Sequence, residues 1–416
     1  MKILHKLAFG LALGIGVAVS TSVFAVEINY WQYVFDARIK AMDQLIANFE
    51  KANPDIKVTQ TTFPYADYQT KVAAAITAGQ GPDVVQFYYG WLNNFKSGQL
   101  IQPLPQDAFP HAQIEKEFFP IISAMKQDGE YWGLPTAVRS LALFYNKNIF
   151  KDAGLDPNKP PVTLDELVDF AKKTAKHDGA GNITSEGLAV DMTGQDHQWW
   201  REVLVRQFGG VPYSDDYSKV TYNDDKGLAA LKWYTDLTTV HKVGQPGFMD
   251  EAQAAFKGGR AAMEIDGSFR LGSFGQIKDF EWAVAELPEK DGVKSNYVSY
   301  WVNGIAANSS GEKLAAAAKF LAYVTSPEAM QIWLKTVGEL PAKPELALTE
   351  ENTKDPIYGP FLQGLQYGHT TLFVDETAQR QTAIDMVNRI ILQNQDPKAS
   401  LDEAAAAEQQ IIDDAK

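Results

Sequence analysis

The chain of 416 residues carries 52 Asp and Glu against 38 Lys and Arg, a formal net charge of −14, and 45% of its residues are apolar. This length suggests two or three domains with a core in each, and the 9 Trp, 17 Tyr and 22 Phe argue against a disordered chain. An acidic chain without a long basic run is a poor match for nucleic acid, and the absence of cysteine excludes disulfides, thiolate metal sites and thiol nucleophiles.

The first 25 residues have the pattern of a secretory signal peptide. Lys2, His5 and Lys6 precede an apolar run at 7–19, and a Val-x-Ala cleavage site ends at Ala25. We prefer cleavage to a membrane anchor because the run is shorter than the ~20 apolar residues that cross a bilayer. The sequence therefore predicts export to the periplasm as a soluble chain without a lipid anchor.

The residues that follow alternate between strand and helix patterns. Strands are predicted at 27–31, 56–63 and 83–87, and helices at 39–49 and 68–78. This order indicates a parallel sheet covered by helices. Open α/β sheets bind ligands at the carboxyl ends of their strands, and the loops after the first and third strands are aromatic: Trp31-Gln32-Tyr33 and Tyr88-Tyr89-Gly90-Trp91.

A second α/β region begins with a strand at 140–145. Thr163 and Glu166 have the spacing of a capping box, which predicts a helix that ends near residue 176. Further strands are predicted at 188–191, 262–266, 281–285 and 297–307, and helices at 198–208, 224–240, 311–324 and 327–336. The tail, 377–415, has the pattern of two helices, the second opened by a capping box at Ser400 and Glu403. Because no Gly- and Ser-rich linker is present, we expect ordered segments to cross between two lobes.

The common catalytic signatures are missing from the sequence. It contains no phosphate-binding loop, dinucleotide-binding glycine motif or nucleophile elbow. The histidines, at 5, 111, 177, 197, 241 and 369, show no metal-ligand spacing. We therefore predict no catalytic residues, no metal and no cofactor. His197 lies in a Gln- and Trp-rich loop and is a candidate hydrogen-bonding side chain.

Aromatic residues are concentrated instead in predicted loops and at strand ends. They are Trp31, Tyr33, Tyr88, Tyr89, Trp91, Trp199, Trp200, Phe269, Tyr300 and Trp301. An aromatic face suits the C–H groups of a pyranose ring, and polar neighbours can satisfy the sugar hydroxyls. These rings therefore predict a sugar site. The alternative for any one of them is core packing, which we assign to Trp132, Trp233, Trp282 and Trp333.

Eight short segments span nearly the whole chain in order. They are FEKANPDIKV at 49–58, GPDVV at 81–85, LPTAVR at 134–139 with LFYNK at 143–147, PVTLDEL at 161–167, FKGGRAAM at 256–263, GIA at 304–306, KFL at 319–321 and SPEA at 326–329. Together they resemble the extracellular solute-binding proteins of bacterial ABC importers, in the sugar-binding cluster that includes the maltose-binding protein.

The resemblance implies the two-lobed periplasmic-binding-protein fold of type II, an α/β fold with the ligand cleft between the lobes. It places the N-terminal lobe at 26–138 and 299–343 and the C-terminal lobe at 139–298 and 344–416, with crossings near Arg139, Tyr300 and Pro341. Carried over position by position, it implies ligand contacts by Trp31, Gln32, Tyr33, Tyr88, Tyr89, Trp91, Arg139, Gln198, Trp199, Trp200, Asp266, Gly267, Phe269, Tyr300 and Trp301.

Two positions depart from the maltose-binding relatives. Arg139 replaces an acidic residue and Trp91 a charged one, which favours a ligand with a negative group and a more apolar site. The resemblance implies a monomer that closes on a sugar or oligosaccharide and docks on membrane permease subunits, with ATP hydrolysis in a separate subunit. Two alternatives stay open. One is a binder of an anionic sugar or phosphorylated polyol held by Arg139, Arg201 or Arg270, and the other is a secreted carbohydrate-active enzyme.

Overall fold

The computed structural model describes residues 25–415, so the predicted signal peptide lies outside the described residues apart from Ala25. The N-terminal half follows the predicted order of strands and helices. β1 (Val26–Tyr33) pairs in parallel with β2 (Ile56–Phe63) and with β3 (Val84–Tyr88). The connecting helices are α1 (Asp36–Ala52) and α2 (Tyr65–Thr77). The aromatic loops therefore lie together at the carboxyl ends of β1 and β3, as the strand-helix order predicts.

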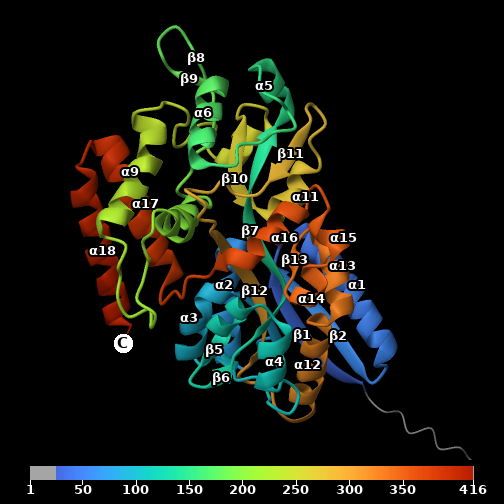
Figure 1. Ribbon diagram of the computed structural model, residues 1–416. Helices are drawn as coiled ribbons and strands as arrows, with labels where there is room; N and C mark the ends of the chain where they lie inside the picture. Colours follow the sequence, from blue (N-terminus) through green and yellow to red (C-terminus); the bar gives the residue numbers. More distant parts are fainter. Residues whose placement is uncertain (1–24, 416) are drawn as a thin grey trace, which may run out of the picture.

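Two long strands join the halves of the molecule (Figure 1). β7 (Leu134–Asn146) and β12 (Asn296–Ala306) pair antiparallel with each other at their centres. β12 continues the sheet through β3, whereas the far end of β7 pairs with β10 (Met263–Gly267) and β11 (Trp282–Ala285). The main sheet thus has the order β10-β7-β12-β3-β1-β2.

We call the part around β1, β2 and β3 the N-terminal lobe and the part around β10 and β11 the C-terminal lobe. The pairing partner of β7 changes from β12 to β10 between Ser140 and Leu141. β13 (Leu340–Pro341) adds a third segment at this point, because it pairs with Val138 and Ala137 of β7. Every residue of β12 is buried, and Arg139 is the one residue of β7 that is not buried. This burial explains why both strands are largely apolar in sequence. The predicted residue limits of the lobes stay a prediction.

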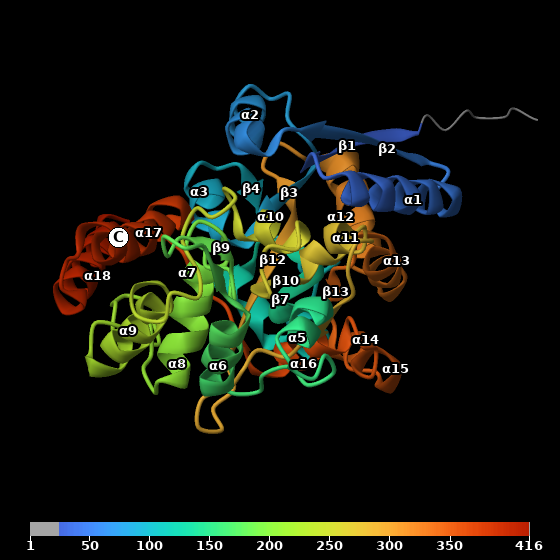
Figure 2. The ribbon, with the colours of Figure 1, turned by 90° about the horizontal axis from the view of Figure 1, so that it is seen from above.

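Helices cover the sheet on both sides of the molecule. α12 (Gly311–Val324) and α13 (Pro327–Val337) lie with α1 in the N-terminal lobe, and α9 (Asp225–Thr239), α17 (Glu376–Gln393) and α18 (Pro397–Asp414) form a group on the opposite side (Figure 2). α6 (Leu164–Thr174) begins at the predicted capping box of Thr163 and Glu166. Within residues 25–415, no helix combines the length and apolar composition needed to cross a membrane.

The remaining elements are short. They are α3 (Leu92–Ser97), β4 (Ile101–Gln102), α4 (His111–Glu117), β5 (Lys126–Gln127), β6 (Glu130–Tyr131), α5 (Lys147–Asp152), β8 (Lys176–His177), β9 (Ile183–Ser185), α7 (Asp196–Gln198), α8 (Val205–Gln207), α10 (Ala252–Lys257), α11 (Leu271–Phe274), α14 (Pro344–Ala347), α15 (Glu350–Thr353), α16 (Gly359–Gly364) and β14 (Gly368–His369).

Two sequence predictions of local structure are wrong. Residues 188–191 form no strand, because this buried segment makes single backbone hydrogen bonds, such as Ala189 N to Met263 O, rather than a ladder. Ser400 does not cap the last helix. α18 begins one turn earlier, where the carboxylate of Asp396 accepts a hydrogen bond from Ala399 N. The Ser400 hydroxyl instead donates to Met386 O in α17 at 2.8 Å, so it holds the two helices together.

Candidate ligand-binding site

A cavity of about 520 Å³ lies where the long strands meet the aromatic loops of the N-terminal lobe. Its walls come from β1, α2, β3, β7, β12 and α17, and from the segments around α7 and after β10. The lining residues are Tyr33, Phe35, Tyr65, Tyr88, Arg139, Gln195, His197, Gln198, Glu251, Phe269, Arg270, Tyr297, Ser299, Trp301 and Arg380. A ligand in this cavity therefore contacts both lobes.

One wall of the cavity is aromatic. Trp301 of β12 pairs in register with Tyr88 of β3, and their ring centroids are 5.9 Å apart. The ring centroid of Tyr33, at the end of β1, lies 4.3 Å from that of Trp301, and the centroid of Tyr65 lies 6.2 Å from it. Residues in register on neighbouring strands share a face of the sheet, so the strand order itself gathers these rings.

Phe269 lies between two guanidinium groups. The Arg139 guanidinium carbon is 4.9 Å from the centroid of the Phe269 ring, and that of Arg270 is 5.2 Å away. Both distances suit a cation–π interaction. Phe269 therefore fixes two cationic groups at the cavity wall in addition to offering its own ring to a ligand.

The charges around the cavity balance. The cations are Arg38, Arg139, Arg270 and Arg380, and the acids are Glu251, Asp266, Glu339 and Glu376. Arg139 Nε donates to Glu339 Oε1 at 2.7 Å, and Arg270 Nε donates to Asp266 Oδ2 at 2.5 Å. Arg38 and Arg380 pair with Glu339 and Glu376 in the same way. Since each guanidinium has five N–H groups, the wall keeps donors for a ligand without carrying net charge.

Two polar groups of the cavity wall have no hydrogen-bond partner among residues 25–415. They are Nδ1 of His197 and Nε2 of Gln198, and both side chains are buried. Burial, together with the nearby cations Arg380 and Arg201, lowers the pKa of His197 well below its ordinary value, so the imidazole is neutral at pH 7. Leaving such buried groups unpaired is unfavourable, and a ligand hydroxyl would satisfy them.

The structure brings six of the predicted site residues together at this cavity: Tyr33, Tyr88, Arg139, Gln198, Phe269 and Trp301. The other nine do not line it. They are Trp31, Gln32, Tyr89, Trp91, Trp199, Trp200, Asp266, Gly267 and Tyr300. Four of them, Gln32, Tyr89, Trp199 and Tyr300, lie immediately beside a lining residue in the sequence, so strand or helix geometry directs their side chains elsewhere.

Trp199 and Trp200 are core residues of the C-terminal lobe. The ring of Trp199 contacts Trp233 and Tyr234, with centroids 5.8 and 5.9 Å away, and Trp200 packs on Tyr222 at 5.1 Å. Residues 199–204 form a π-helical turn, so consecutive side chains point in different directions. Gln198 therefore faces the cavity while the two indoles fill the core.

The alternation of strand residues removes two more side chains from the cavity, those of Gln32 and Tyr300. The amide of Gln32 bonds to Gln60. Trp31 is on the same face of β1 as Tyr33, but it packs on Phe63 of β2, with centroids 4.8 Å apart. Tyr300 points away from Trp301, and its hydroxyl donates to Ile121 O at 2.9 Å. Successive side chains of a strand point to opposite faces, so the neighbours of lining residues cannot line the same cavity.

Tyr89 and Trp91 support the aromatic wall from behind. The Tyr89 hydroxyl bonds to the Tyr297 hydroxyl at 2.9 Å, and the Trp91 ring meets the edge of Trp301 at a centroid distance of 5.2 Å. Arg201 does not line the cavity either, because it is fully buried and pairs with Glu408. It therefore cannot hold an anion there, and of the three candidate arginines only Arg139 and Arg270 remain.

Several lining residues lack a strong sequence pattern. Tyr297 and Ser299 precede Trp301 at intervals of two along β12, so strand periodicity could have identified them. Gln195, Glu251 and Arg380 come from loops and from α17, far apart in the sequence, and no local pattern indicates that they meet. Phe35 is the N-cap residue of α1 and Tyr65 is the first residue of α2, so both follow the end of a strand.

Gly267 is required for the position of Phe269. A Cβ atom at Gly267 would come within 2.1 Å of Cε1 of the Phe269 ring, although the backbone φ of −84° suits any residue. We therefore expect Gly267→Ala to displace this ring and weaken ligand binding by about 1 kcal/mol, the scale of a lost aromatic contact. Calorimetry measures this change, with Gly179→Ala, at an exposed turn position where a Cβ atom meets nothing, as the comparison. Unchanged affinity in Gly267→Ala would contradict a role for Phe269.

Glu186 is a buried carboxyl group near this site. Burial, with a smaller contribution from Asp196 and Asp191, raises its pKa to about 8. Between pH 6.5 and 8 the folded protein keeps this proton while the unfolded chain, with a pKa near 4.3, has lost it, so stability falls as pH rises. In the wild type this one group lowers the free energy of unfolding by up to about 1.4 kcal/mol for each pH unit. We expect this contribution to be absent in Glu186→Gln, so the stability of the variant should fall less between pH 6.5 and pH 8. Urea unfolding at pH 6.5 and pH 8 tests this, and parallel profiles for both proteins would contradict it.

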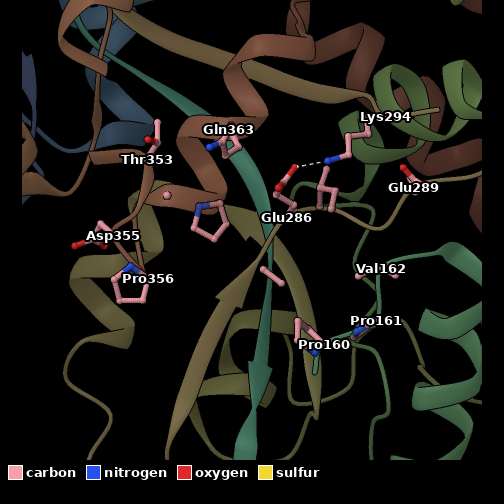
Figure 3. Close-up of a pocket in the computed structure, with 14 residues that line it drawn as sticks. Pro160, Pro161, Val162, Glu286, Glu289, Lys294, Thr353, Asp355, Pro356 and Gln363 are labelled. Carbon is pink, nitrogen blue, oxygen red and sulfur yellow. Dashed lines mark hydrogen bonds and ion pairs between the residues drawn. The ribbon is translucent and has the colours of Figure 1, made fainter. Parts of the chain in front are cut away.

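A second cavity, of about 610 Å³, lies near α16 and has different chemistry (Figure 3). Four prolines line it, and Lys294 forms an ion pair with Glu286 at 2.9 Å across one wall. Among the described residues that line it, none is aromatic and none was predicted as a site residue. Within residues 25–415, no group of three or more His, Asp or Glu side chains is arranged to hold a metal ion. The cavity between the lobes is therefore the candidate site.

Solved structures share this fold. An ABC transporter solute-binding protein from Thermotoga lettingae, bound with α-D-tagatose, has a TM-score of 0.79 and 23% identity, over 93% of this chain and 100% of that chain. The cyclic α-maltosyl-1,6-maltose-binding protein from Arthrobacter globiformis has a TM-score of 0.79 and 20% identity, over 94% of this chain and 100% of that chain. Both likenesses show the two-lobed architecture.

Sequence comparison identifies the family. The sn-glycerol-3-phosphate-binding periplasmic protein UgpB of Shigella dysenteriae is 26% identical over 413 residues, 89% of this chain and 90% of that protein. UgpB of Escherichia coli K12 is 25% identical over 410 residues, with the same coverage. Residues 44–360, more than half of the chain, match the family model for bacterial extracellular solute-binding proteins. The chain belongs to the bacterial extracellular solute-binding proteins.

Proposed function

We propose that this protein is the substrate-binding component of a bacterial ABC importer and that it binds a sugar or oligosaccharide in the cavity between the lobes. One observation carries the proposal: His197 and Gln198, each with an unpartnered polar group, line the same cavity as the aromatic wall that includes Trp301. Rings suit the apolar face of a sugar, and the unpaired groups suit its hydroxyls. Solved neighbours bound to α-D-tagatose and maltotetraose support this choice.

Lobe closure would couple binding to transport. The rings of Tyr33 and Trp301 belong to the N-terminal lobe, and His197 and Gln198 to the C-terminal lobe. A solute that contacts both sets stabilises the closed state by its differential affinity for that state. We propose that the signal peptide directs export to the periplasm, and that the closed monomer docks on the permease while another subunit hydrolyses ATP.

A phosphorylated polyol is the second candidate ligand. Three guanidinium groups line the cavity, those of Arg139, Arg270 and Arg380, and the UgpB relatives bind sn-glycerol 3-phosphate. Guanidinium groups are good partners for phosphate. Each of the three already pairs with a carboxylate, however, so an anion would meet a balanced wall. This balance argues against an anionic ligand.

A thermal-shift screen of the mature protein separates the candidates. The panel contains neutral mono- and oligosaccharides, acidic sugars and sn-glycerol 3-phosphate, and a ligand that binds only the folded state raises the unfolding temperature. We expect a neutral sugar to give the largest shift. A shift with sn-glycerol 3-phosphate alone would favour the second candidate, and turnover of a glycan without stoichiometric binding would indicate an enzyme.

The aromatic residues are tested by truncation. We expect Phe269→Ala and Trp301→Ala each to weaken binding of the sugar found in the screen by about 1–3 kcal/mol, because aromatic contact area is lost. Trp31→Ala is the comparison, since Trp31 packs on Phe63 outside the cavity. Calorimetry on folded protein gives the three affinities. Wild-type affinity in both cavity variants would refute the site.

A further inference from the structure

A smaller chamber of about 190 Å³ adjoins the ligand cavity. The two share four lining residues, Gln195, Glu251, Arg270 and Arg380, so they lie side by side. At roughly 30 Å³ of liquid volume per water molecule, the chamber has room for about six waters. A substituent of a few heavy atoms on a bound sugar could therefore reach into it.

Carboxyl groups dominate the chamber. Five of them line it: Asp191, Asp196, Glu251, Glu264 and Asp266. They come from three separate segments: residues 191–196 up to the start of α7, the residue before α10, and β10. The two lining cations are already engaged, since Arg270 pairs with Asp266 and Arg380 pairs with Glu376. Among residues 25–415, the other four acids make no ion pair within 4.0 Å.

Glu264 is the most deeply buried of these acids, and its carboxyl group shares a hydrogen bond with Asp266. Its side chain is 2% exposed, and within the described chain no hydrogen-bond donor reaches Oε2. Burial and the neighbouring Asp266 raise the pKa of Glu264 well above its ordinary value, and burial raises the pKa of Asp196 to about 8. A buried acid without a cation keeps its proton, so Glu264 and Asp196 are carboxyl groups that a bound cation would ionise.

We propose that this chamber receives a primary ammonium group and that the transported solute is an amino sugar or amino polyol. This inference rests on the proposed function, because the sugar ring occupies the aromatic cavity while its amine enters the chamber. A primary ammonium has three N–H donors but needs only one or two of these carboxyl groups as acceptors, among them Glu264 with its unpartnered Oε2.

The lining distinguishes between kinds of cation. A quaternary ammonium group needs aromatic faces around it, and among the described residues that line the chamber none is aromatic. A bare metal ion needs ligands gathered around one point, and no such group exists within residues 25–415. A hydrogen-bonding ammonium group fits both observations.

Matched sugar pairs test the proposal. Glucosamine against glucose, galactosamine against galactose and mannosamine against mannose are titrated calorimetrically into the mature protein at pH 6.5, where the amines are charged. We expect one amino sugar to bind at least about tenfold more tightly than its neutral partner. Glu264→Gln and Glu251→Gln are expected to reduce this preference to less than about threefold. Glu251 is exposed, so that variant keeps the test valid if Glu264→Gln does not fold.

Glu345→Gln is the control, because Glu345 is an exposed acid of α14 outside the chamber, and it should keep the wild-type preference. Equal or tighter binding of the neutral sugar in every pair would overturn the chamber proposal and leave the proposed function intact. A preference for the amine that both chamber variants retain would also overturn it. If no sugar of the screen or of the pairs binds, the proposed function and this inference fail together.

Discussion

Glu339→Ala is expected to lower the free energy of unfolding by about 3–5 kcal/mol and to weaken ligand binding as well. The Glu339 carboxylate is buried and accepts hydrogen bonds from Arg38 at 2.5 Å, Arg139 at 2.7 Å and Trp333 at 2.7 Å. Removing it leaves Arg38, which is 1% exposed, without a counter-charge. Loss of one partner of a buried ion pair lowers the free energy of unfolding by about 3–5 kcal/mol, because the other charge stays buried and unpaired. Urea unfolding measures the change in stability.

The effect on binding follows from Arg139. Its guanidinium loses the carboxylate that holds it beside Phe269. The Arg139 and Phe269 side chains are then no longer fixed at the cavity wall, and the ligand is bound more weakly. Glu339→Gln keeps an acceptor and should restore part of both losses. Glu350→Ala breaks the exposed pair with Lys354 and should leave stability and affinity unchanged. Wild-type stability in Glu339→Ala would contradict a structural role for this cluster.

Glu408→Ala is expected to cost as much stability, about 3–5 kcal/mol, without changing the affinity of the folded protein. Its buried carboxylate accepts hydrogen bonds from Arg201 at 3.3 Å, Tyr222 at 2.7 Å and Gln379 at 3.0 Å, and also from Tyr213. This cluster ties α18 to α17 and to residues 199–204, behind the cavity. Urea unfolding and calorimetry on the same sample separate the two quantities.

The conservative variant Glu408→Gln supplies the control. It keeps hydrogen-bond acceptors for the tyrosines but removes the charge opposite Arg201, so its loss should be smaller than that of Glu408→Ala. If Glu408→Ala abolished binding in protein that is still folded, the separation between core cluster and ligand site would be wrong.

Periodicity and caps predict much of the fold. The helix at 311–324 has the predicted limits, and so does the strand at 56–63, because their apolar patterns end at clear stop residues. The capping box at Thr163 is confirmed, whereas the one at Ser400 is wrong because a tertiary partner, Met386 O, takes the hydroxyl. A local pattern cannot distinguish these cases, since the competing partner is distant in the sequence.

The candidate site was predictable where strands end. Tyr33, Tyr88 and Trp301 line the cavity because β1, β3 and β12 are neighbours in the sheet. Trp199 and Trp200 could not be separated from Gln198 by composition, because only the turn geometry sends them in different directions. Glu251 and Arg380 depend on contacts between segments more than a hundred residues apart, which one sequence does not reveal.

Arg380 also has a consequence for how the protein matures. It lies in α17 and lines both the cavity and the chamber beside it. Tyr33 of β1, near the other end of the chain, lines the same cavity. The cavity therefore gains all of its lining residues only after the chain has been synthesised through α17, and the solute cannot stabilise a nascent chain that stops before that helix.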